Sequence, residues 1–392
     1  MLNFNHYVNT KFIFNDEAEK LVGSKLNELG VKKVLLHYGS ESSLKRGNLF
    51  NIINDSLKEF GIETYKLGGV EPNPRLDLVN NGIKVVKDNG IDFILAIGGG
   101  SVIDSAKAIA MGSCYDGDVW DFFTSKQGIT KSLPVGVVLT YPASGSESSN
   151  VSVINNTKTN EKYLVSSDYI RPCIVFMNPK LTYSLPKFLT SCGIVDMFSH
   201  ISERYFSPSS DFGVIDRMAE GALRSLVNVG LKVLDEPDNY EYRSELMWIG
   251  TIAHNDTLGV GREQDWATHV IGNELSALYD ITHGATLSII MPSWMKYVYK
   301  DNIERFSRYA IKVFNVNPHG LGEEEIAIEG IKQTKKFFIE LGMPTSFKNM
   351  NIPTDNIDKM VDKIKYSDET QTIGSLKKLN RQDVLNIYNM SI

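Results

Sequence analysis

Residues 92–104 read DFILAIGGGSVID, an apolar run that ends in three consecutive glycines and continues as a helix-like segment. The apolar run has the length of a buried strand, and the glycines let the backbone turn sharply and approach a ligand closely. A helix that starts at such a turn offers unpaired N–H groups and a positive dipole end to a phosphate. The usual dinucleotide fingerprint is incomplete, because Ile103 stands where its third glycine would be. A plain strand-to-helix turn with Ser101 as N-cap explains the glycines equally well.

The alternation of strand and helix extends in both directions from this turn. The expected strands are Lys33–Tyr38, Ile62–Leu67, Asp92–Ile97 and Pro134–Leu139, and the expected helices are Leu44–Phe60, Arg75–Asn89 and Val102–Met111. Such alternation is typical of a mostly parallel sheet that is covered by helices on both faces.

From Pro186 onward the pattern changes, because strand-like runs nearly disappear and long amphipathic segments follow one another. The expected helices here are Asp211–Leu234, Tyr242–Asn255, Trp266–Leu278 and Glu323–Leu341. We therefore predict two domains, which fits a chain of 392 residues. An α/β dinucleotide-binding domain with a parallel sheet spans residues 1–185, and an all-helical, metal-binding domain spans residues 186–392.

The composition excludes several classes of function. The chain has 41 Lys and Arg against 47 Asp and Glu, and this net charge of −6 argues against nucleic acid or an anionic membrane surface as the main partner. No apolar run approaches the roughly 18 residues that cross a bilayer. Three scattered cysteines are too few for a disulfide framework, and the first residues do not resemble a secretory signal. A cytoplasmic protein is expected.

Two further turns resemble the glycine turn in position. Gly39 and Ser40 follow the strand Lys33–Tyr38, and the hydroxyl-rich segment Thr140–Glu147 follows the strand Pro134–Leu139. In a doubly wound sheet these turns lie at the carboxyl ends of the strands, where ligands bind. Three such turns on one edge favour a nucleotide. The candidate cofactor-binding residues are Gly39, Ser40, Ser42, Gly99, Gly100, Ser101, Asp104, Thr140 and Ser144.

A candidate metal site begins with Asp196 and His200. At a spacing of four residues both side chains share one helix face, with their Cβ atoms about 5–6 Å apart. A carboxylate beside an imidazole suits a divalent cation, although the pair alone fits a simple Asp–His contact better.

His269 and His283 strengthen the case for a metal. A straight helix from one to the other would be about 21 Å long, so the chain must bend if both bind one ion. Asp280 or Thr282 is a natural N-cap for a new helix that carries His283. The remaining histidines are interpreted as structural: His6 in an N-terminal strand, His37 inside the sheet, His254 on a helix without an evident partner, and His319 in a loop.

Together these motifs resemble the iron-dependent (group III) alcohol dehydrogenase family, and in particular its NADPH-dependent butanol dehydrogenase or broad aldehyde reductase branch. The resemblance covers essentially the whole chain. Its matching segments are Glu71–Pro74 (EPNP), Gly98–Lys107 (GGGSVIDSAK), Ser144–Glu147 (SGSE), the pair Asp196 and His200, and Asp265–His283.

The resemblance implies a fold, a cofactor set and a partner. It implies an N-terminal α/β nucleotide domain, a C-terminal helical domain, and a homodimer that is joined through the N-terminal strand. Lys162 matches a lysine that contacts the cofactor in the family, although it also fits an ordinary surface lysine. The residues that match the family's ligands for Fe²⁺, sometimes replaced by zinc, are Asp196, His200, His269 and His283.

The sequence departs from the family at Asn273, where many relatives carry a histidine near the nicotinamide. Asparagine cannot titrate, so any proton transfer must pass to water, a cofactor hydroxyl or another side chain. Ser144 stands where threonine is usual, and this change keeps the hydroxyl.

The expected cofactor is NADP rather than NAD. Relatives that prefer NAD tend to carry an acidic residue at the end of the second strand, whereas here Gly39 and Ser40 form the turn, with Lys45 and Arg46 nearby. A neutral turn with cations beside it favours a 2′-phosphate. Glu41 is an acidic residue close to this turn and argues for NAD instead. Lys45 and Arg46 can also be explained as part of a solvated helix face.

The resulting hypothesis is hydride transfer between NAD(P)H and primary alcohols or aldehydes of the butanol and butanal type, beside a Lewis-acidic cation. One alternative is a lyase or cyclase of the dehydroquinate synthase type. That reaction needs basic residues for a phosphate-bearing substrate, and the region Asp196–His283 offers few. The other alternative is a catalytically weak protein that binds nucleotide and metal, which Asn273 suggests.

Overall fold

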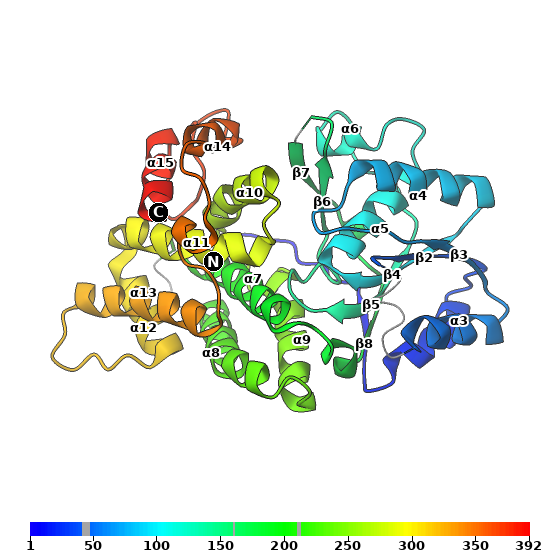
Figure 1. Cartoon of the computed structure of the whole chain (residues 1–392), viewed down its shortest axis with the longest axis horizontal. Coiled ribbons are helices and arrows are strands. Elements are labelled where there is room, and N and C mark those ends of the chain that lie inside the picture. Colours follow the sequence, from blue (N-terminus) through cyan, green and yellow to red (C-terminus); the bar gives the residue numbers. More distant parts are fainter. Residues whose placement is uncertain (41–47, 160, 210–212) are drawn as a thin grey trace. The chain divides into compact units, whose positions relative to one another are not determined.

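The computed structural model describes residues 1–40, 48–159, 161–209 and 213–392 (Figure 1). The chain forms two compact units. The sheet unit contains Tyr7–Leu185 and Asp238–Thr251, and the helical unit contains Met1–His6, Pro186–Pro237 and Ile252–Ile392. The units change over at Leu185 and Pro186, where the sequence predicts a domain boundary, while two short segments group with the other half of the chain.

Within the described residues of the sheet unit, six strands form one parallel sheet in the order β1-β8-β5-β4-β2-β3. Their bounds are β1 Lys11–Phe14, β2 Lys33–Tyr38, β3 Glu63–Leu67, β4 Phe93–Gly99, β5 Val135–Tyr141 and β8 Ile174–Met177. A separate antiparallel hairpin pairs β6 Val151–Asn156 with β7 Glu161–Ser166. The fold class is therefore the predicted one, with an α/β unit that contains a parallel sheet and a second, helical unit.

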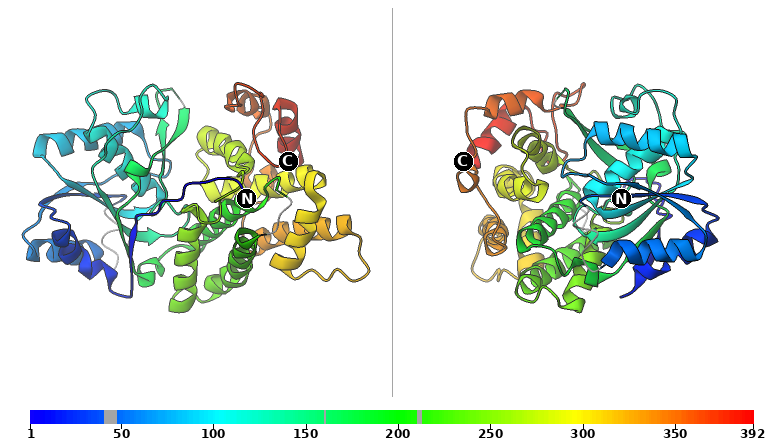
Figure 2. Two further views of the ribbon diagram at one scale, coloured as in Figure 1. Left: turned by 180° about the vertical axis from the view of Figure 1, so that it is seen from behind. Right: turned by 45° about the vertical axis from the view of Figure 1, so that its right-hand side comes forward.

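Helices cover both faces of this sheet (Figure 2). On the central strand β4, Phe93 and Leu95 belong to a core that includes side chains of α1 and α3. Ile94 and Ala96 face the opposite core, which includes α4 and α5. Alternate side chains of a strand point to opposite faces, so burial on both sides explains why the strand is apolar throughout. These helices are α1 Val22–Glu28, α3 Leu49–Glu59, α4 Leu76–Asn89 and α5 Gly100–Ser113.

The strand order places the predicted turns at one edge. β2 and β4 are neighbours, as are β4 and β5. The strand that follows β2 along the chain lies on one side of this pair, and the strand that follows β4 lies on the other. The order thus reverses between β2 and β4, and ligands of doubly wound sheets bind outside the carboxyl ends of the strands at such a point.

Several predicted details change in the structure. α5 begins at Gly100 with Gly99 as its N-cap, so the N-cap position suggested for Ser101 is wrong. His6 precedes the first strand, which begins only at Lys11. The hairpin β6–β7 and the four-residue strand β8 have no counterpart in the sequence prediction.

The helical unit is built around α7, Lys187–Tyr205, whose side chains are buried from Thr190 to its end. A helix that is buried on all sides is typical of the centre of a helical domain, although α7 also carries polar and charged residues. Its other helices are α8 Val214–Asp235, α10 Ala267–Tyr279, α11 His283–Val298, α12 Ile303–Phe314, α13 Glu323–Glu340, α14 Ile357–Lys363 and α15 Arg381–Met390.

The remaining helices are short or pass from one unit to the other. α9, Tyr240–His254, begins in the sheet unit and ends in the helical unit. The short helices are η1 Ala18–Leu21, α6 Trp120–Phe123, η3 Asp168–Ile170, η4 Pro179–Thr182, η5 Tyr299–Asn302 and η6 Phe347–Met350. Among the described residues, no helix has both the length and the apolar character that a membrane span requires.

Candidate metal centre

The four predicted metal ligands all lie in the helical unit. Asp196 and His200 occupy successive turns of α7, His269 lies in the first turn of α10, and His283 is the first residue of α11. The chain bends between the last two, as the sequence argument requires. Asp280 ends α10 in the left-handed conformation, with φ of 51°, and Thr282 takes the N-cap position of α11 without a side-chain capping hydrogen bond.

The three imidazoles approach one carboxylate oxygen. Asp196 Oδ1 lies 3.2 Å from His200 Nε2, 3.7 Å from His269 Nε2 and 3.8 Å from His283 Nε2. One potential ligand atom from each of Asp196, His200 and His269 lies within 4.8 Å of the other two. Metal–ligand bonds of about 2.0–2.2 Å place neighbouring ligand atoms roughly 3–4 Å apart, so the distances from Asp196 Oδ1 suit a single cation. His283 is not part of the compact group of three, and its place in the candidate site rests on its distance to Asp196 Oδ1.

The chemistry of these atoms also fits a cation. Asp196 Oδ1 and His269 Nε2 are buried, and neither makes a hydrogen bond within the described parts of the chain. Buried polar atoms nearly always have a hydrogen-bond partner. A divalent cation would supply the partner for both atoms, and the set of one carboxylate and three imidazoles is one that Fe²⁺ and Zn²⁺ accept.

The surroundings keep two of the candidate ligands in the protonation states that bind metal. Burial alone would raise the pKa of Asp196, but the adjacent imidazoles hold it well below the usual range, so the group is a carboxylate. Burial and the neighbouring His269 lower the pKa of His200 to about 4, which leaves that ring neutral.

His269 behaves differently. Burial would lower the pKa of its ring, but Glu203 and Asp196 outweigh burial and raise the pKa to about 9. Without a metal, the position between these two carboxylates therefore already favours a positive charge.

Two neighbours of the ligands were not predicted. Glu203, on α7, contacts His269 Nδ1. It lies three residues after His200, and this spacing places it on the same side of the helix, a signal that was available in the sequence. His254 Nδ1 lies 2.5 Å from His200 Nδ1, which corrects the interpretation that His254 has no partner. These two histidines are 54 positions apart, so no local pattern relates them.

The glycine turn of the sheet unit is shaped by close packing. A Cβ atom on Gly99 would lie 2.8 Å from Tyr141 Cβ, and one on Gly100 would lie 2.3 Å from Ser144 Oγ. The end of β5 and the segment after it can therefore approach the start of α5 only because Gly99 and Gly100 lack side chains. Thr140 is in β5 itself, and Ser101 is in the first turn of α5.

The other predicted cofactor residues are placed as follows. Asp104 accepts hydrogen bonds from Ser146 Oγ at 2.5 Å and from the Val153 N–H at 3.0 Å, so it joins α5 to β6. Lys162 Nζ donates to Asn73 Oδ1 at 3.1 Å. Gly39 and Ser40 follow β2 directly. Ser42 lies outside the described residues, as do Glu41, Lys45 and Arg46.

Asn273 is four residues after His269 on α10 and is half-buried. This spacing puts the two side chains on the same side of the helix.

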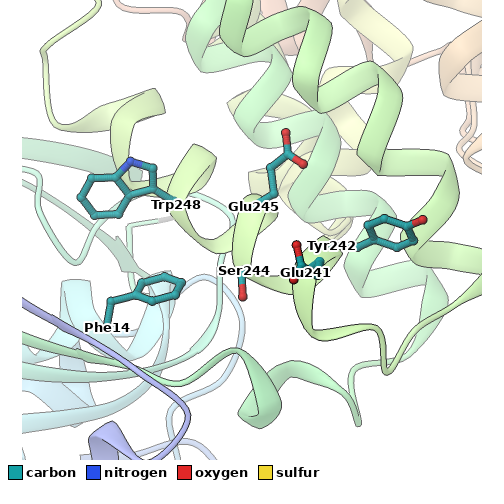
Figure 3. Close-up of a pocket in the computed structure, with 6 residues that line it drawn as sticks. All are labelled: Phe14, Glu241, Tyr242, Ser244, Glu245 and Trp248. Atoms are coloured by element: carbon teal, nitrogen blue, oxygen red, sulfur yellow. The ribbon is translucent and has the colours of Figure 1, made fainter.

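A separate hollow of about 640 Å³ opens in the sheet unit (Figure 3). Phe14 of β1 and Trp248 of α9 stand on one side of it, and the residues that line it are Phe14, Glu241, Tyr242, Ser244, Glu245 and Trp248. None of the predicted site residues is among them, so the hollow does not belong to the predicted nucleotide edge.

Comparison with known proteins supports the resemblance along the whole chain. The profile of the iron-containing alcohol dehydrogenases matches residues 9–179, and the profile of the C-terminal region of the Fe-containing alcohol dehydrogenase family matches residues 190–392. The probable NADH-dependent butanol dehydrogenase 1 of Bacillus subtilis (strain 168) is 41% identical over 392 residues, which is 100% of each chain. The NADPH-dependent aldehyde reductase YqhD of Escherichia coli (strain K12) is 35% identical over 95% of each chain.

Solved structures agree with the fold. The crystal structure of NADH-dependent butanol dehydrogenase A from Thermotoga maritima superimposes with a TM-score of 0.95 at 40% identity, covering 100% of this chain and 99% of the other. From the matching profiles, the full-length relatives and this superposition we conclude that the chain belongs to the iron-containing alcohol dehydrogenase family.

Proposed function

We propose that this chain transfers hydride between NAD(P)H and small primary alcohols or aldehydes, with a divalent cation bound in its helical unit. The observation that carries the proposal is the approach of three imidazole nitrogens to Asp196 Oδ1 within 3.2–3.8 Å. Relatives that match the whole or nearly the whole chain are described as butanol dehydrogenases and an aldehyde reductase, and this supports the substrate class.

Asp196, His200, His269 and His283 would hold the cation. When bound, the cation supplies a Lewis acid that polarises the oxygen of an alcohol or aldehyde. Four protein ligands already fill a tetrahedral zinc site, so a set that must also admit substrate suits Fe²⁺ better. Zinc is the alternative metal.

The protein surrounds the proposed cation with charged and polar ligand atoms that are shielded from solvent. Asp196 and His200 are each only 4% exposed, and both keep their ligand forms at neutral pH for the reasons given above. Electrostatic effects are stronger in such a low-dielectric site than in water. Asn273 cannot exchange a proton, so water or a cofactor hydroxyl would have to serve that need.

We assign the nucleotide to the carboxyl edge of β2, β4 and β5. The reversal of strand order there supports this position, as do the two glycines that admit the close approach of Tyr141 and Ser144. Asp104 would act indirectly, by holding the hairpin. The proposed contacts are Gly39, Ser40, Ser42, Gly99, Gly100, Ser101, Thr140, Ser144 and Lys162.

For the cofactor we propose NADH, against the sequence expectation of NADPH. Lys45 and Arg46, which favoured the 2′-phosphate, lie outside the described residues and gain no structural support. The relatives from Bacillus subtilis and Thermotoga maritima, at about 40% identity, are described as NADH-dependent, whereas the NADPH-dependent reductase is 35% identical. The proposal is tested by measuring kcat/KM with NADH and with NADPH. A higher value with NADH supports it, and a higher value with NADPH contradicts it.

We also propose that the chain forms a homodimer and is located in the cytoplasm. β1 is an edge strand of the sheet, so its outer side has backbone groups that can pair with another strand. Cys114, Cys173 and Cys192 are unpaired thiols, which suits a reducing compartment.

The decisive assay measures butanal reduction after anaerobic reconstitution with Fe²⁺. We expect His269→Ala and His283→Ala each to lower kcat/KM at least about a thousandfold, because loss of a ligand removes the cation, while circular dichroism shows a preserved fold. Net consumption of NADH or NADPH excludes a lyase. Full activity of a metal-free His269→Ala protein would contradict the proposal.

A further inference from the structure

Glu203 is a fully buried acid on α7, with no measurable exposure to solvent. A carboxylate in such a place needs several partners to offset its lost hydration. Within the described parts of the chain, the hydrogen-bond partners of its carboxylate come from the start of α10. The backbone N–H groups of Thr268 and His269 donate to its Oε1 at 2.7 and 3.1 Å, and the Thr268 hydroxyl donates to the same oxygen.

These bonds replace a missing helix cap. The N-cap residue of α10 is Trp266, which has a left-handed φ of 66° and makes no side-chain capping bond. The first free N–H of the helix, on Ala267, donates instead to Asp265 Oδ1 at 3.0 Å. Glu203 accepts from the next two, and the carboxylate thereby also faces the positive end of the helix dipole.

The second oxygen of Glu203 meets the ring of His269. Glu203 Oε2 contacts Nδ1 of this ring. An ionised carboxylate can only accept a hydrogen bond, so the ring must carry a hydrogen on Nδ1. The lone pair of the neutral ring is then on Nε2, the atom that lies 3.7 Å from Asp196 Oδ1.

We propose that Glu203 is a positioning residue that fixes the tautomer and orientation of His269, so that Nε2 faces the cation. The inference rests on the metal site of the proposed function and extends it to a residue that does not touch the metal. A carboxylate behind a ligating histidine typically raises metal affinity 10–100-fold.

His200 is fixed by a different set of contacts. Arg204 donates from its guanidinium to His254 Nδ1 at 3.2 Å, and arginine has no lone pair with which to accept. His254 Nδ1 is therefore the acceptor, and His200 Nδ1, at 2.5 Å, must be the donor. His200 Nε2 then carries the lone pair, 3.2 Å from Asp196 Oδ1.

Arg204 is itself held in place for this contact. Its other terminal nitrogen donates to the His200 carbonyl at 3.0 Å, and its guanidinium lies over the Trp266 ring at 4.5 Å. From this independent observation we infer that His254 positions His200 as Glu203 positions His269.

Glu203→Gln tests the first assignment. Glutamine keeps the size of the side chain and an oxygen that accepts from the N–H groups of α10, but it turns an amide N–H₂ toward His269 Nδ1. The ring must then accept at Nδ1 and carry its hydrogen on Nε2, which removes the lone pair from the metal side.

The probe is Co²⁺, titrated into the metal-free full-length protein by calorimetry and followed by its visible absorption spectrum. We expect wild type to bind one ion per chain and Glu203→Gln to bind it 10–100-fold more weakly, with an altered spectrum. Thr268→Val removes one donor to Glu203 but leaves the bond to His269, so it should lower the melting temperature without changing Co²⁺ affinity.

Glu220→Gln is the matched control. Glu220 is another buried acid of the helical unit, bound to both Arg308 and the Tyr205 hydroxyl rather than to a metal ligand. This variant should lose stability and keep wild-type Co²⁺ affinity. Equal affinity and identical spectra for Glu203→Gln and wild type would refute the positioning role alone. Failure of wild type to bind Co²⁺ would refute the metal site, and this inference with it.

His254→Asn and His254→Leu test the second assignment. The amide oxygen of asparagine can take the place of the accepting Nδ1, whereas leucine offers no acceptor. We expect the leucine variant to lose Co²⁺ affinity at least tenfold and the asparagine variant to recover most of it. Equal losses in both variants, or no loss in the leucine variant, would overturn the role of His254.

Discussion

At the residue scale, local rules relate the four candidate ligands, so the sequence alone was enough to propose them. The spacing of Asp196 and His200 fixes a shared helix face, and the need for a bend between His269 and His283 follows from helix length. The residues behind the ligands are different. Glu203 could have been suspected from its position after His200, but its contact with His269 joins residues 66 positions apart and depends on how α7 and α10 pack.

His37 provides a test of burial at the residue scale. It is fully buried in β2, with Nδ1 2.9 Å from the Leu67 carbonyl and Nε2 2.8 Å from Ser105 Oγ. Burial lowers the pKa of its ring from 6.5 to about 4. The unfolded chain therefore takes up a proton at a pH where the folded chain does not, and the free energy of unfolding should fall as the pH drops from 6.5 to 4.

The expected loss is about 3 kcal/mol, since each pKa unit corresponds to about 1.4 kcal/mol. His37→Gln removes this titration. We expect the difference in unfolding free energy between wild type and His37→Gln, measured in urea, to be constant above pH 7 and to shrink steadily between pH 6.5 and 4. A difference that does not change with pH would contradict the account of His37.

At the element scale, periodicity predicted the strands and helices that are buried on well-defined faces. β2 has the predicted bounds, α4 begins one residue later than predicted and ends at the predicted residue, and α5 extends two residues beyond the prediction at each end. The hairpin β6–β7 was not predicted from the sequence. β7 (EKYLVS) does not alternate between apolar and polar residues, and in β6 (VSVINN) the alternation covers only the first three residues. The strand β8 has only four residues, too few to establish a period.

The packing of α11 on α7 sets the distance between His283 and Asp196. A Cβ atom on Gly284 would lie 2.2 Å from the Cys192 carbonyl oxygen and 2.7 Å from Cys192 Cα. Cys192 is one turn before Asp196 on α7, so a side chain at position 284 would force the two helices apart beside the metal ligands. We expect Gly284→Ala to cost about 1–3 kcal/mol of stability and to weaken Co²⁺ binding at least tenfold.

Gly221→Ala is the control for this prediction. Gly221 lies inside α8, and a Cβ atom there would meet no atom within 4 Å among the described residues. Alanine should stabilise that helix by about 0.5–1 kcal/mol and leave metal affinity unchanged. Wild-type affinity in Gly284→Ala would show that the close approach of α7 and α11 does not set the site.

At the scale of the whole molecule, composition and pattern predicted two halves of different architecture. They did not predict that Met1–His6 and Asp238–Thr251 group with the opposite unit, because this assignment follows from long-range contacts. The candidate ligands of the cation lie in the helical unit, and the proposed contacts of the nucleotide lie in the sheet unit.

This division predicts separate responses to the two ligands in hydrogen exchange. Co²⁺ at a hundred times its dissociation constant stabilises the unit that binds it by about 2.7 kcal/mol. We expect the metal to slow amide exchange in α7, α10 and α11, and NADH alone to slow exchange at the ends of β2, β4 and β5. Protection of the strand ends by metal alone would contradict the assignment of the two sites.

The most direct test of the account is anomalous diffraction at the iron absorption edge from crystals reconstituted with Fe²⁺. We predict one strong peak per chain, within about 2.0–2.3 Å of a carboxylate oxygen of Asp196 and of Nε2 in His200, His269 and His283. A peak bound by other residues, or no peak among these four side chains, would contradict the central claim that they hold one cation.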